Sequence, residues 1–499
     1  MDLLALSGLW DLKGLLLFLL VFLLIADYLK NRKPPSYPPG PAGLPFVGNI
    51  FEISPKEPHL QVAKLAKDYG NIFSLRRGRD LVVFVSGFKL VKEALVTQGE
   101  NFADRPCTNI ARKIYPENCE SGLFFSNGHT WKKQRRFALS TLRNFGLGKK
   151  TLELAICEES RCLLEELERQ KGDAFDPTNL FSKAVGNIIC QMVFGRRFDY
   201  SDHTYQQHLD SLADAVHLLG SIWAQFYDAF PTIMKHLPGR HNDLFRHYET
   251  VGAFIRENIE KHKKEHNPDN PKDYIDAFIT EMENSSHDST DGFYEFNLIR
   301  NTFDLFVAGT ETSSTTLLWG LVLMMKHPDV QEKVQAEIDA VIGQSRPPMM
   351  SDRLDMPYTD AVIHEVQRVG NIVPLNDPRV AMKDTTLGGY FIPKGTTLMA
   401  SLTSVLFDES EWETPDSFNP GHFLDAEGKF RKPEAFWPFS AGKRVCPGES
   451  LAKMELFLFF VSLFQKFRFS APEGMELSLE GIVGGTRTPY PFKIHTHPR

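Results

Sequence analysis

The stretch that decides the fold is "FSAGKRVCPG", residues 439–448, which places Cys446 behind a glycine turn and just before a long apolar helix. Gly442 and Gly448 allow the backbone to turn tightly and to approach a flat object. The unpaired N–H groups at the start of the following helix favour a thiolate over a thiol, and so do the charges of Lys443 and Arg444. We therefore expect Cys446 to act as a nucleophile or as a metal ligand.

The surrounding sequence narrows the role of Cys446. A nucleophile needs a nearby general base such as histidine, and the local sequence has none. A zinc site needs three further ligands at a recognisable spacing, and these are missing. "HEVQR", which begins at His364, is a near match to the zinc helix pattern, but Arg368 stands where the second histidine belongs. One anionic sulfur with room for a planar partner suits the axial ligand of a haem iron.

Length and composition limit the class of protein. A chain of 499 residues without a Ser/Gly linker, an acidic tail or repeats favours one large, mostly helical body. The net charge of −7 argues against a nucleic-acid partner. The six cysteines show no CxxC spacing, so a disulfide framework is not expected and a reducing compartment fits better. The five cysteines other than Cys446 are expected to be ordinary buried or surface residues.

The N-terminal segment is a membrane anchor by composition. Residues 3–26 are apolar apart from Asp11 and Lys13, which is about the 20 residues that a spanning helix needs. The following "DYLKNRKPPSYPPGP" contains no small-residue cleavage site, so an anchor is favoured over a secretory signal peptide.

The charges after the anchor predict its orientation. Lys30, Arg32 and Lys33 outweigh the charges before the helix, which leaves the body on the cytosolic side of the membrane. The prolines that follow favour a stiff, extended connector. We divide the chain into a transmembrane anchor (1–30), a basic, proline-rich connector (31–48) and a body (49–499).

Hydrophobic periodicity predicts mainly helices in the body. Residues 221–239 are unusually apolar for an exposed loop, which suggests a second membrane contact or a substrate door, and a packed loop remains the alternative. The expected elements are a helix over 59–69, a hairpin over 71–87, amphipathic helices between 131 and 264, a long helix over 297–327 that Pro328 ends, helices over 329–342 and 358–369, short strands over 387–402, a polar meander over 407–436 and a last helix over 450–467.

Three motifs together resemble those of the cytochromes P-450. The cysteine loop matches FxxGxRxCxG at every fixed position, an ExxR pair lies upstream, and "AGTET" resembles the oxygen-activation motif of the central helix. The resemblance covers the whole chain, and "NIICQMVFGRRFDY" and "FNPGHFLD" are similar to the microsomal family-two enzymes of vertebrates. The matching residues are Phe439, Gly442, Arg444, Cys446 and Gly448, then Glu365 and Arg368, then Ala308 to Thr312.

This resemblance implies a fold and an activity. The fold is mainly α, a large single cytochrome P-450-type helical domain with small β-sheets plus an N-terminal transmembrane helix. The cofactor is haem b with Cys446 as its thiolate ligand, and NADPH supplies electrons through NADPH-cytochrome reductase, with cytochrome b5 as a further partner. The substrates are O2 and a lipophilic molecule such as a fatty acid, a steroid or a foreign compound. The protein is expected in the endoplasmic reticulum membrane, spanning it once with its catalytic domain in the cytosol.

The central helix carries the expected proton chemistry. Ala308 and Gly309 are small enough for a flat cofactor to lie against, and Gly309, Thr310 and Thr312 are weak helix formers, so a local widening or kink is expected. Thr312 and Glu311 can then deliver protons during dioxygen activation, as general acid catalysis requires. The alternative is that both are ordinary helix residues.

Glu365 and Arg368 are three residues apart on a helix and can pair on one face. The resemblance implies that this pair is buried and tied to the meander. His422 stands where relatives often carry arginine, so the pairing is expected to weaken if His422 is neutral.

Trp131 and Arg135 are four residues apart, which brings an indole N–H and a guanidinium together for a haem propionate. By resemblance, Arg105, Arg379 and Arg444 also point at the propionates. Arg379 departs from the histidine of many relatives.

A basic face is expected to receive the acidic flavoprotein reductase, which charge steering would accelerate. A solvated surface is the alternative reading of the same residues. They are Lys132, Lys133, Arg136, Arg143 and Lys443.

The predicted substrate pocket depends on the resemblance and on helix geometry, and core packing is the alternative for each residue. The candidates are Phe306, Ala308, Val373, Val483 and Gly484.

Two other functions stay open at this point. A haem-thiolate isomerase or dehydratase would need no reductase, although Glu311 and Thr312 would then have no proton relay to serve. A non-catalytic haem-binding sensor or membrane scaffold would leave the basic face unexplained.

Overall fold

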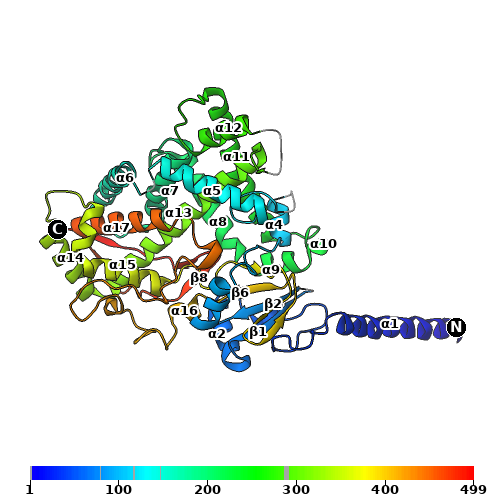
Figure 1. Cartoon of the computed structure of the whole chain (residues 1–499). Coiled ribbons are helices and arrows are strands. Elements are labelled where there is room, and N and C mark those ends of the chain that lie inside the picture. Colours follow the sequence, from blue (N-terminus) through cyan, green and yellow to red (C-terminus); the bar gives the residue numbers. More distant parts are fainter. Residues whose placement is uncertain (1–2, 79, 116–118, 147, 286–290) are drawn as a thin grey trace.

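The computed structural model describes residues 3–78, 80–115, 119–146, 148–285 and 291–499, and it shows a helical body with small sheets, which confirms the expected fold class (Figure 1). The helices are α1 (Leu3–Lys30), α2 (Pro58–Tyr69), α3 (Phe88–Lys92), α4 (Asn109–Ile114), α5 (Gly128–Asn144), α6 (Lys150–Arg169), α7 (Thr178–Phe194), α8 (His203–Leu219), α9 (Ile222–Ala229), α10 (Pro231–Met234), α11 (Arg240–Glu265), α12 (Tyr274–Asn284), α13 (Glu295–Lys326), α14 (Pro328–Val341), α15 (Pro357–Gly370), α16 (Thr403–Leu406) and α17 (Glu449–Lys466).

The strands form one four-stranded sheet, in the order β1-β2-β6-β3, and three two-stranded ribbons. In the larger sheet β1 and β2 form the expected hairpin, and the much later β6 joins β2 in parallel. The strands are β1 (Ile72–Arg77), β2 (Asp80–Val85), β3 (Arg379–Val380), β4 (Thr385–Leu387), β5 (Tyr390–Ile392), β6 (Thr397–Ala400), β7 (Phe467–Ser470), β8 (Gly481–Val483), β9 (Arg487–Pro489) and β10 (His495–Pro498).

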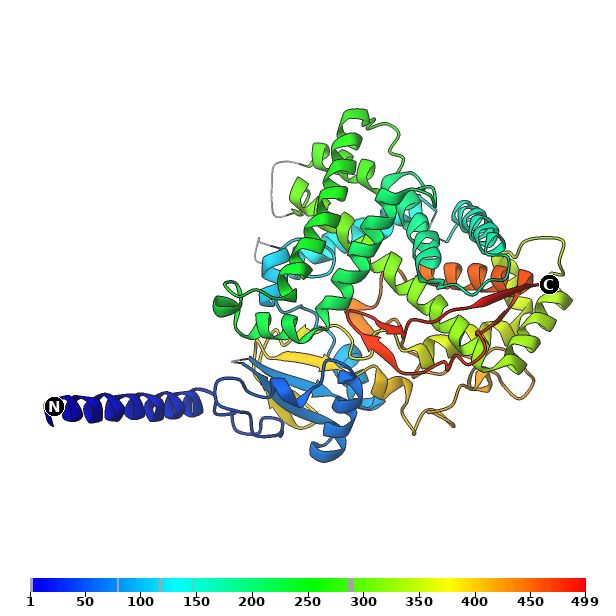
Figure 2. The same ribbon diagram turned by 180° about the vertical axis from the view of Figure 1, so that it is seen from behind.

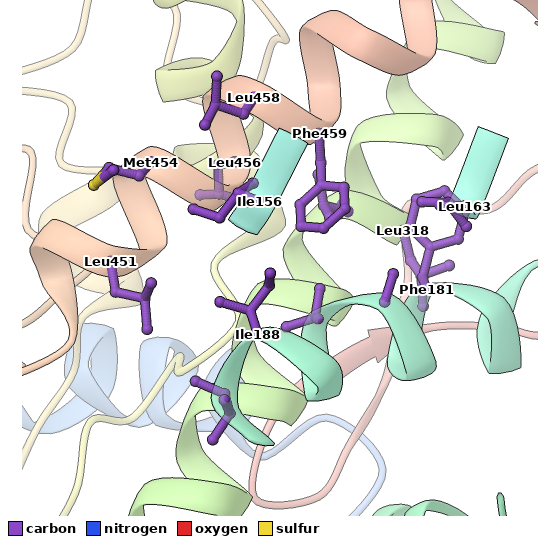
Figure 3. Close-up of a cluster of buried hydrophobic side chains, with 14 of the residues drawn as sticks. Ile156, Leu163, Phe181, Ile188, Leu318, Leu451, Met454, Leu456, Leu458 and Phe459 are labelled. Atoms are coloured by element: carbon purple, nitrogen blue, oxygen red, sulfur yellow. The ribbon is translucent and has the colours of Figure 1, made fainter. Parts of the chain in front are cut away.

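The core lies where α13 and α17 cross and are enclosed by α6, α7 and α15 (Figure 1). Almost the whole of α17 after its first turn is buried, as expected for a helix that is apolar all round. Figure 3 shows side chains of α17 such as Leu456 and Phe459 beside Ile156, Leu318 and Phe181 of the neighbouring helices. This core fixes the start of α17, and Cys446 directly precedes it.

Helix α1 stands away from the body in both views (Figures 1 and 2). Its span Leu12–Lys30 has a mean hydropathy of 2.3, and none of its residues is buried in the body. Because such a helix is unstable in water, its exposed apolar surface supports the predicted membrane anchor.

The proline-rich connector packs onto the body instead of standing free as a spacer. The backbone N–H of Ser74 in β1 donates to the Pro39 carbonyl at 2.7 Å, and Arg76 donates to the Leu44 carbonyl at 2.5 Å. Arg76 also forms an ion pair of 3.2 Å with Asp27, near the end of α1. The expectation of an extended spacer over 31–48 is therefore corrected for the part of the connector that contacts β1.

Most expected helices are confirmed, and two expectations are corrected. Residues 221–239 contain the two short helices α9 and α10, not a loop, because Ser221 caps α9 and Pro231 begins α10. Cys107 and Cys119 form a disulfide around α4, although their spacing did not suggest a pair. The fold brings these two cysteines together, which local sequence cannot show.

Candidate active site

The cysteine loop is a tight turn closed by its own backbone. The N–H of Cys446 donates to the Phe439 carbonyl at 3.0 Å, and Ser440 and Gly442 have positive φ angles of 62° and 75°. A Cβ atom at Gly442 would lie 1.8 Å from the Leu95 carbonyl oxygen, so only glycine fits there. Gly448 has an ordinary φ of −89°, so its backbone does not require glycine as the sequence suggested.

The Cys446 thiol is more affected by burial than the sequence indicated. Burial raises the pKa of Cys446 to about 11, although the Gly448 N–H and the charge of Arg135 act to lower it. The cations and the helix N-terminus that we expected to favour a thiolate are thus present. In the protein alone, however, their effect on the pKa of Cys446 is smaller than that of burial. A bound metal ion would supply the missing positive charge, because it deprotonates a coordinating thiol.

Arg444 fastens the cysteine loop to the segment before α5. Its Nε donates to the Ala103 carbonyl at 2.8 Å, and its Nη2 donates to the Ser126 carbonyl at 2.7 Å and to Asn127 Oδ1 at 2.9 Å. Its guanidinium lies 3.8 Å from the centre of the Trp131 ring. Since these donors already have partners, the main role of Arg444 is to hold the cysteine loop against this segment by hydrogen bonds. A haem propionate could accept only from the remaining hydrogen on Nη1.

Arg379 provides the test of whether an anionic group fits this site. It is 1% exposed, and its Nε and Nη1 have no hydrogen-bond partner within the described part of the chain. Arg105 is buried beside it and also has an unpartnered Nε, although its Nη2 reaches Asp377 at 3.2 Å. Buried guanidinium donors without acceptors are costly, so they indicate a ligand that brings negative charge. The two carboxylates of a haem meet this need.

The arginines around the cysteine loop repel one another. Burial, followed by the charge of Arg105, lowers the pKa of Arg379 to about 8, and Arg444 and Arg135 contribute in the same direction. Arg135 lies against the loop, because its Nη2 donates to the Val445 carbonyl at 2.5 Å. The predicted propionate residues are therefore brought together around a site with too much positive charge.

The middle of α13 has one open face. Ala308 is exposed and Thr312, one turn later, is partly exposed, although most of this helix is buried. Gly309 faces elsewhere, because its Cβ would lie 2.3 Å from Ile189 Cδ1 of α7. Its small size therefore serves helix packing, and only Ala308 of the two remains suited to lie against a flat cofactor.

The two proton-handling candidates have separate surroundings. The Thr312 hydroxyl donates to the Ala308 carbonyl at 2.7 Å, and α13 continues through this turn without the expected widening. Glu311 accepts from the Thr486 hydroxyl at 3.2 Å, and burial raises the pKa of its carboxyl group. Because burial favours the protonated form of this carboxyl group, Glu311 is suited to donate a proton.

Glu365 and Arg368 form a bidentate ion pair without any solvent exposure, at 2.7 and 2.8 Å. Arg368 also donates to meander carbonyls, including those of Pro415 and Ser417, both at 2.7 Å. His422 lies 3.3 Å from Glu365, and its Nε2 accepts from the Thr414 N–H, so the neutral ring still donates from Nδ1. The concern that a neutral His422 weakens the contact is therefore not supported by this geometry.

The comparisons with known proteins agree with this site. The sequence profile described as "Cytochrome P450" matches residues 38–495. The chain belongs to the cytochrome P450 family. It is 50% identical to human cytochrome P450 2J2 over 98% of this chain and 96% of that protein, and 48% identical to rat cytochrome P450 2J3 over 99% and 98%. Rabbit cytochrome P450 2B4 is 44% identical over 96% of this chain and 99% of its own length.

As a cytochrome P450, the protein is a membrane-anchored haem-thiolate monooxygenase of the microsomal family-two type. It uses O2 and electrons from NADPH, passed through a reductase, to hydroxylate or epoxidise lipophilic substrates. Haem, when bound, supplies the redox chemistry that activates dioxygen. Cys446 would ligate its iron, and the donors of Arg379 and Arg105 would hold its carboxylates.

The candidate pocket residues of this P450 divide into two groups. Phe306 is fully buried and packs against Phe194 and Phe254, at ring distances of 5.8 and 5.9 Å, so the expectation that it lines the substrate pocket is corrected to the alternative of core packing. Val483 and Gly484 lie at the end of β8 and abut the C-terminal end of α8, since a Cβ at Gly484 would lie 2.7 Å from His217 Cα. Val373 is partly exposed, as are Val483 and Gly484, so these three and Ala308 remain candidates.

The basic residues differ in how freely they can meet a partner. Lys132, Arg136 and Arg143 are exposed and form no ion pair among the described residues. Lys133 is paired with Asp291, and Lys443 is paired with Glu100 at 2.7 Å. The open part of the basic face is therefore smaller than the sequence suggested.

Sequence reasoning missed Asp304, one turn before Ala308. Its carboxylate accepts from the N–H groups of Leu123 and Phe124 at 2.7 and 2.9 Å and from the Tyr115 hydroxyl at 2.5 Å. Burial raises its pKa to about 6. Asp304 and Arg444 thus both hold the same segment, Asp304 through the N–H groups of Leu123 and Phe124 and Arg444 through acceptors on residues 126 and 127. The sequence could have pointed to Asp304 because this residue lies four positions before Ala308 in the predicted central helix.

Proposed function

We propose that this cytochrome P450 oxidises its lipophilic substrate between the open face of α13 and the turn after β8, with Cys446 as iron ligand and Thr312 and Glu311 as the proton-handling residues. The observation that carries this assignment is the set of buried, unpartnered arginine donors beside the Cys446 loop, because these donors require an anionic cofactor there.

The two proton-handling residues reach the site from different sides. The Thr312 hydroxyl lies on the open face and donates to the Ala308 carbonyl, so it can exchange that hydrogen bond for one with bound water. Glu311 is held by Thr486 in the turn after β8, next to the candidate pocket residues Val483 and Gly484. In this proposal, Glu311 stores a proton at its carboxyl group and Thr312 passes it on.

Replacement of Thr312 by Ala tests the relay. With purified NADPH-cytochrome reductase, we expect NADPH and O2 consumption to continue, while product falls at least about 10-fold per NADPH, since one positioned proton donor contributes about 100-fold or more. Thr316→Ala is the matched control, because its hydroxyl makes the same contact one turn later, to the Thr312 carbonyl at 2.9 Å, from a buried position.

Unchanged coupling in Thr312→Ala would remove Thr312 from the relay. Product formed without NADPH or reductase would instead indicate an isomerase or dehydratase. Difference spectra recorded with fatty acids, steroids and drugs would define the substrate class.

The proposed redox partner is NADPH-cytochrome reductase, with cytochrome b5 as a second donor, at the face formed by the basic residues of α5. Support comes from Lys132, Arg136 and Arg143, which are exposed and have no ion-pair partner in the described ranges. Arg136→Ala should raise the KM for reductase about 2- to 5-fold at low salt and change it little at high salt, because rim charges act mainly through steering. Lys133→Ala should have less effect, since Asp291 already neutralises Lys133.

The proposed location is the endoplasmic reticulum membrane, with a single span and the body in the cytosol. The charges after α1 support this orientation. A second bilayer contact is proposed at α9 and α10, which lie on the side from which α1 emerges in both views (Figures 1 and 2). Ile233 in α10 and Leu237 just after it are 60% and 46% exposed, and Phe51 beside Phe226 is 64% exposed.

Protease digestion of sealed microsomes tests the predicted topology. It should remove the body and spare α1, whereas protection of the body would show the opposite topology.

A further inference from the structure

A cluster of histidines and aspartates lies far from the cysteine loop in sequence, where α11 ends and α12 begins. One nitrogen of His262 and one oxygen each of Asp273 and Asp276 lie within 4.8 Å of one another. Both aspartates are buried, and the His262 side chain is 15% exposed. We propose that this cluster, completed by His266, is a structural zinc site.

The hydrogen bond at the far side of the His262 ring fixes its tautomer. Nδ1 lies 2.7 Å from the Asn258 carbonyl, which can only accept, so Nδ1 carries the proton. The lone pair of Nε2 then points at Asp273 Oδ2, 2.9 Å away, in the neutral ring. Two acceptors facing each other need a cation between them or a second proton on the ring. A backbone carbonyl behind the ligating histidine is the usual outer-shell partner of a metal site.

Each aspartate uses one oxygen for the backbone and directs the other at a histidine. Asp273 Oδ1 accepts from the Asp276 N–H at 2.9 Å, and Asp276 Oδ2 accepts from the Lys272 N–H at 3.1 Å. The remaining oxygens are Oδ2 of Asp273, which faces His262, and Oδ1 of Asp276, which lies 3.7 Å from His266 Nδ1. The helix cap therefore orients the carboxylates and leaves a ligand atom on each.

His266 is the second, independent indication of a ligand. Its side chain is only 6% exposed, yet Nδ1 has no hydrogen-bond partner in the part of the chain that the structure describes. Its Nε2 faces the Thr280 hydroxyl at 3.3 Å. A buried imidazole nitrogen that faces a carboxylate at 3.7 Å without bonding to it is suited to a shared metal ion.

The ligand set favours zinc over calcium or magnesium. Two imidazoles and two carboxylates give four ligands, the number that structural zinc sites use, whereas calcium and magnesium prefer oxygen alone. Zinc distances of about 2.0–2.1 Å separate tetrahedral ligands by about 3.3 Å. His262 Nε2 and Asp273 Oδ2, which are 2.9 Å apart, need to separate slightly. The Asp276 oxygen, within 4.8 Å of both, needs to approach them, and so does His266 Nδ1, which lies 3.7 Å from Asp276 Oδ1.

The surroundings leave little room for the cluster to spread. Gly195, directly after α7, has a φ of 67°, and a Cβ there would lie 2.6 Å from Asp273 Oδ2. The ion would thus lie at the junction of α11 and α12, where the end of α7 packs against it. Because α11 also packs against α8 and α9, zinc bound at the end of α11 would stabilise this group of helices.

The test uses the full-length, untagged protein with its haem, in detergent, after removal of metals with a chelator. We expect one zinc ion per chain after incubation with Zn²⁺ and gel filtration, measured by mass spectrometry of the metal, and a higher Tm with Zn²⁺. His266→Gln should lose the bound zinc without loss of the haem spectrum. Asp273→Asn should also lose the zinc while keeping the helix cap, since asparagine caps as well as aspartate.

The matched control is His247→Gln, on the same helix. His247 lies 3.8 Å from Asp214 but is not part of a cluster of three ligands, so this variant should bind zinc as wild type does. Zinc bound equally by wild type, His266→Gln and Asp273→Asn would be adventitious and would overturn the proposal. A wild-type protein that binds no zinc, with a Tm that Zn²⁺ does not change, would reduce the cluster to an imidazolium–carboxylate pair and would also overturn it.

Discussion

Arg368 and Arg379 are equally buried, at 0% and 1% exposure, but their surroundings differ completely. Arg368 meets a bidentate carboxylate and three backbone carbonyls. Arg379 leaves Nε and Nη1 without partners among the residues described, and the charge of Arg105 repels it. The polypeptide completes the first site by itself, whereas the second is complete only when an anion is bound.

The same contrast divides the buried acids. Glu365 accepts from Arg368, the Asn419 N–H and His422. Glu455 in α17 accepts one hydrogen bond, from the Ser313 hydroxyl at 2.6 Å, and its Oε1 has no partner within the described ranges. A buried hydrogen-bond network in which every polar group has a partner makes the protein rigid. A buried polar group without a partner marks a place where a proton or a ligand is required.

The largest expected effect follows from breaking the complete network. Arg368→Ala leaves the Glu365 carboxylate buried without its cation, which costs about 3–5 kcal/mol of unfolding free energy. Arg161→Ala is the control, because Arg161 and Glu158 have the same i,i+3 spacing but are both exposed, and its loss of unfolding free energy should be much smaller than that of Arg368→Ala. Urea unfolding followed by fluorescence measures both. Equal losses would show that burial of the Glu365–Arg368 pair adds nothing to stability.

The sequence predicted the elements well because periodicity and helix ends are local properties. The long helix over 297–327 and the last helix over 450–467 both exist, with α13 beginning two residues earlier and ending one residue earlier than expected.

Features that depend on distant neighbours could not be predicted in this way. Gly309 faces Ile189 and Phe306 faces Phe254, because the packing of α7 and α11 decides which side of α13 is open. The Cys107–Cys119 disulfide and the contact between the connector and β1 also depend on the fold. The sequence identified Arg379 as a candidate, but only the structure shows that its donors lack partners.

Glu455, whose Oε1 has no hydrogen-bond partner among the described residues, should make the unfolding free energy depend on pH. Burial raises the pKa of Glu455 to about 8, above its value in the unfolded chain. Its contribution is therefore fully present below about pH 4.5 and is lost as pH rises through 8, on the order of 5 kcal/mol. Glu455→Gln removes this dependence and keeps an acceptor for Ser313, so the variant should gain on wild type between pH 5 and 9. The exposed Glu476→Gln should follow wild type, and a constant difference between wild type and Glu455→Gln would mean that Glu455 does not titrate in this range.

Arg379→Met tests the difference between the two buried arginines. The substitution should leave the haem-free protein as stable or more stable, and it should weaken the binding of haem in the loaded protein. In the haem-free protein the substitution removes a buried cation that has no acceptor for two of its donors, so the unfolding free energy should stay the same or rise. In the haem-loaded protein it removes a charge-assisted hydrogen bond of about 1.5–3 kcal/mol, so haem should transfer to apomyoglobin about 10- to 100-fold faster. The exposed Arg431→Met should change neither measurement. If Arg379→Met destabilised the haem-free protein as Arg368→Ala does, the polypeptide itself would be satisfying Arg379, and the two buried arginines would not differ in kind.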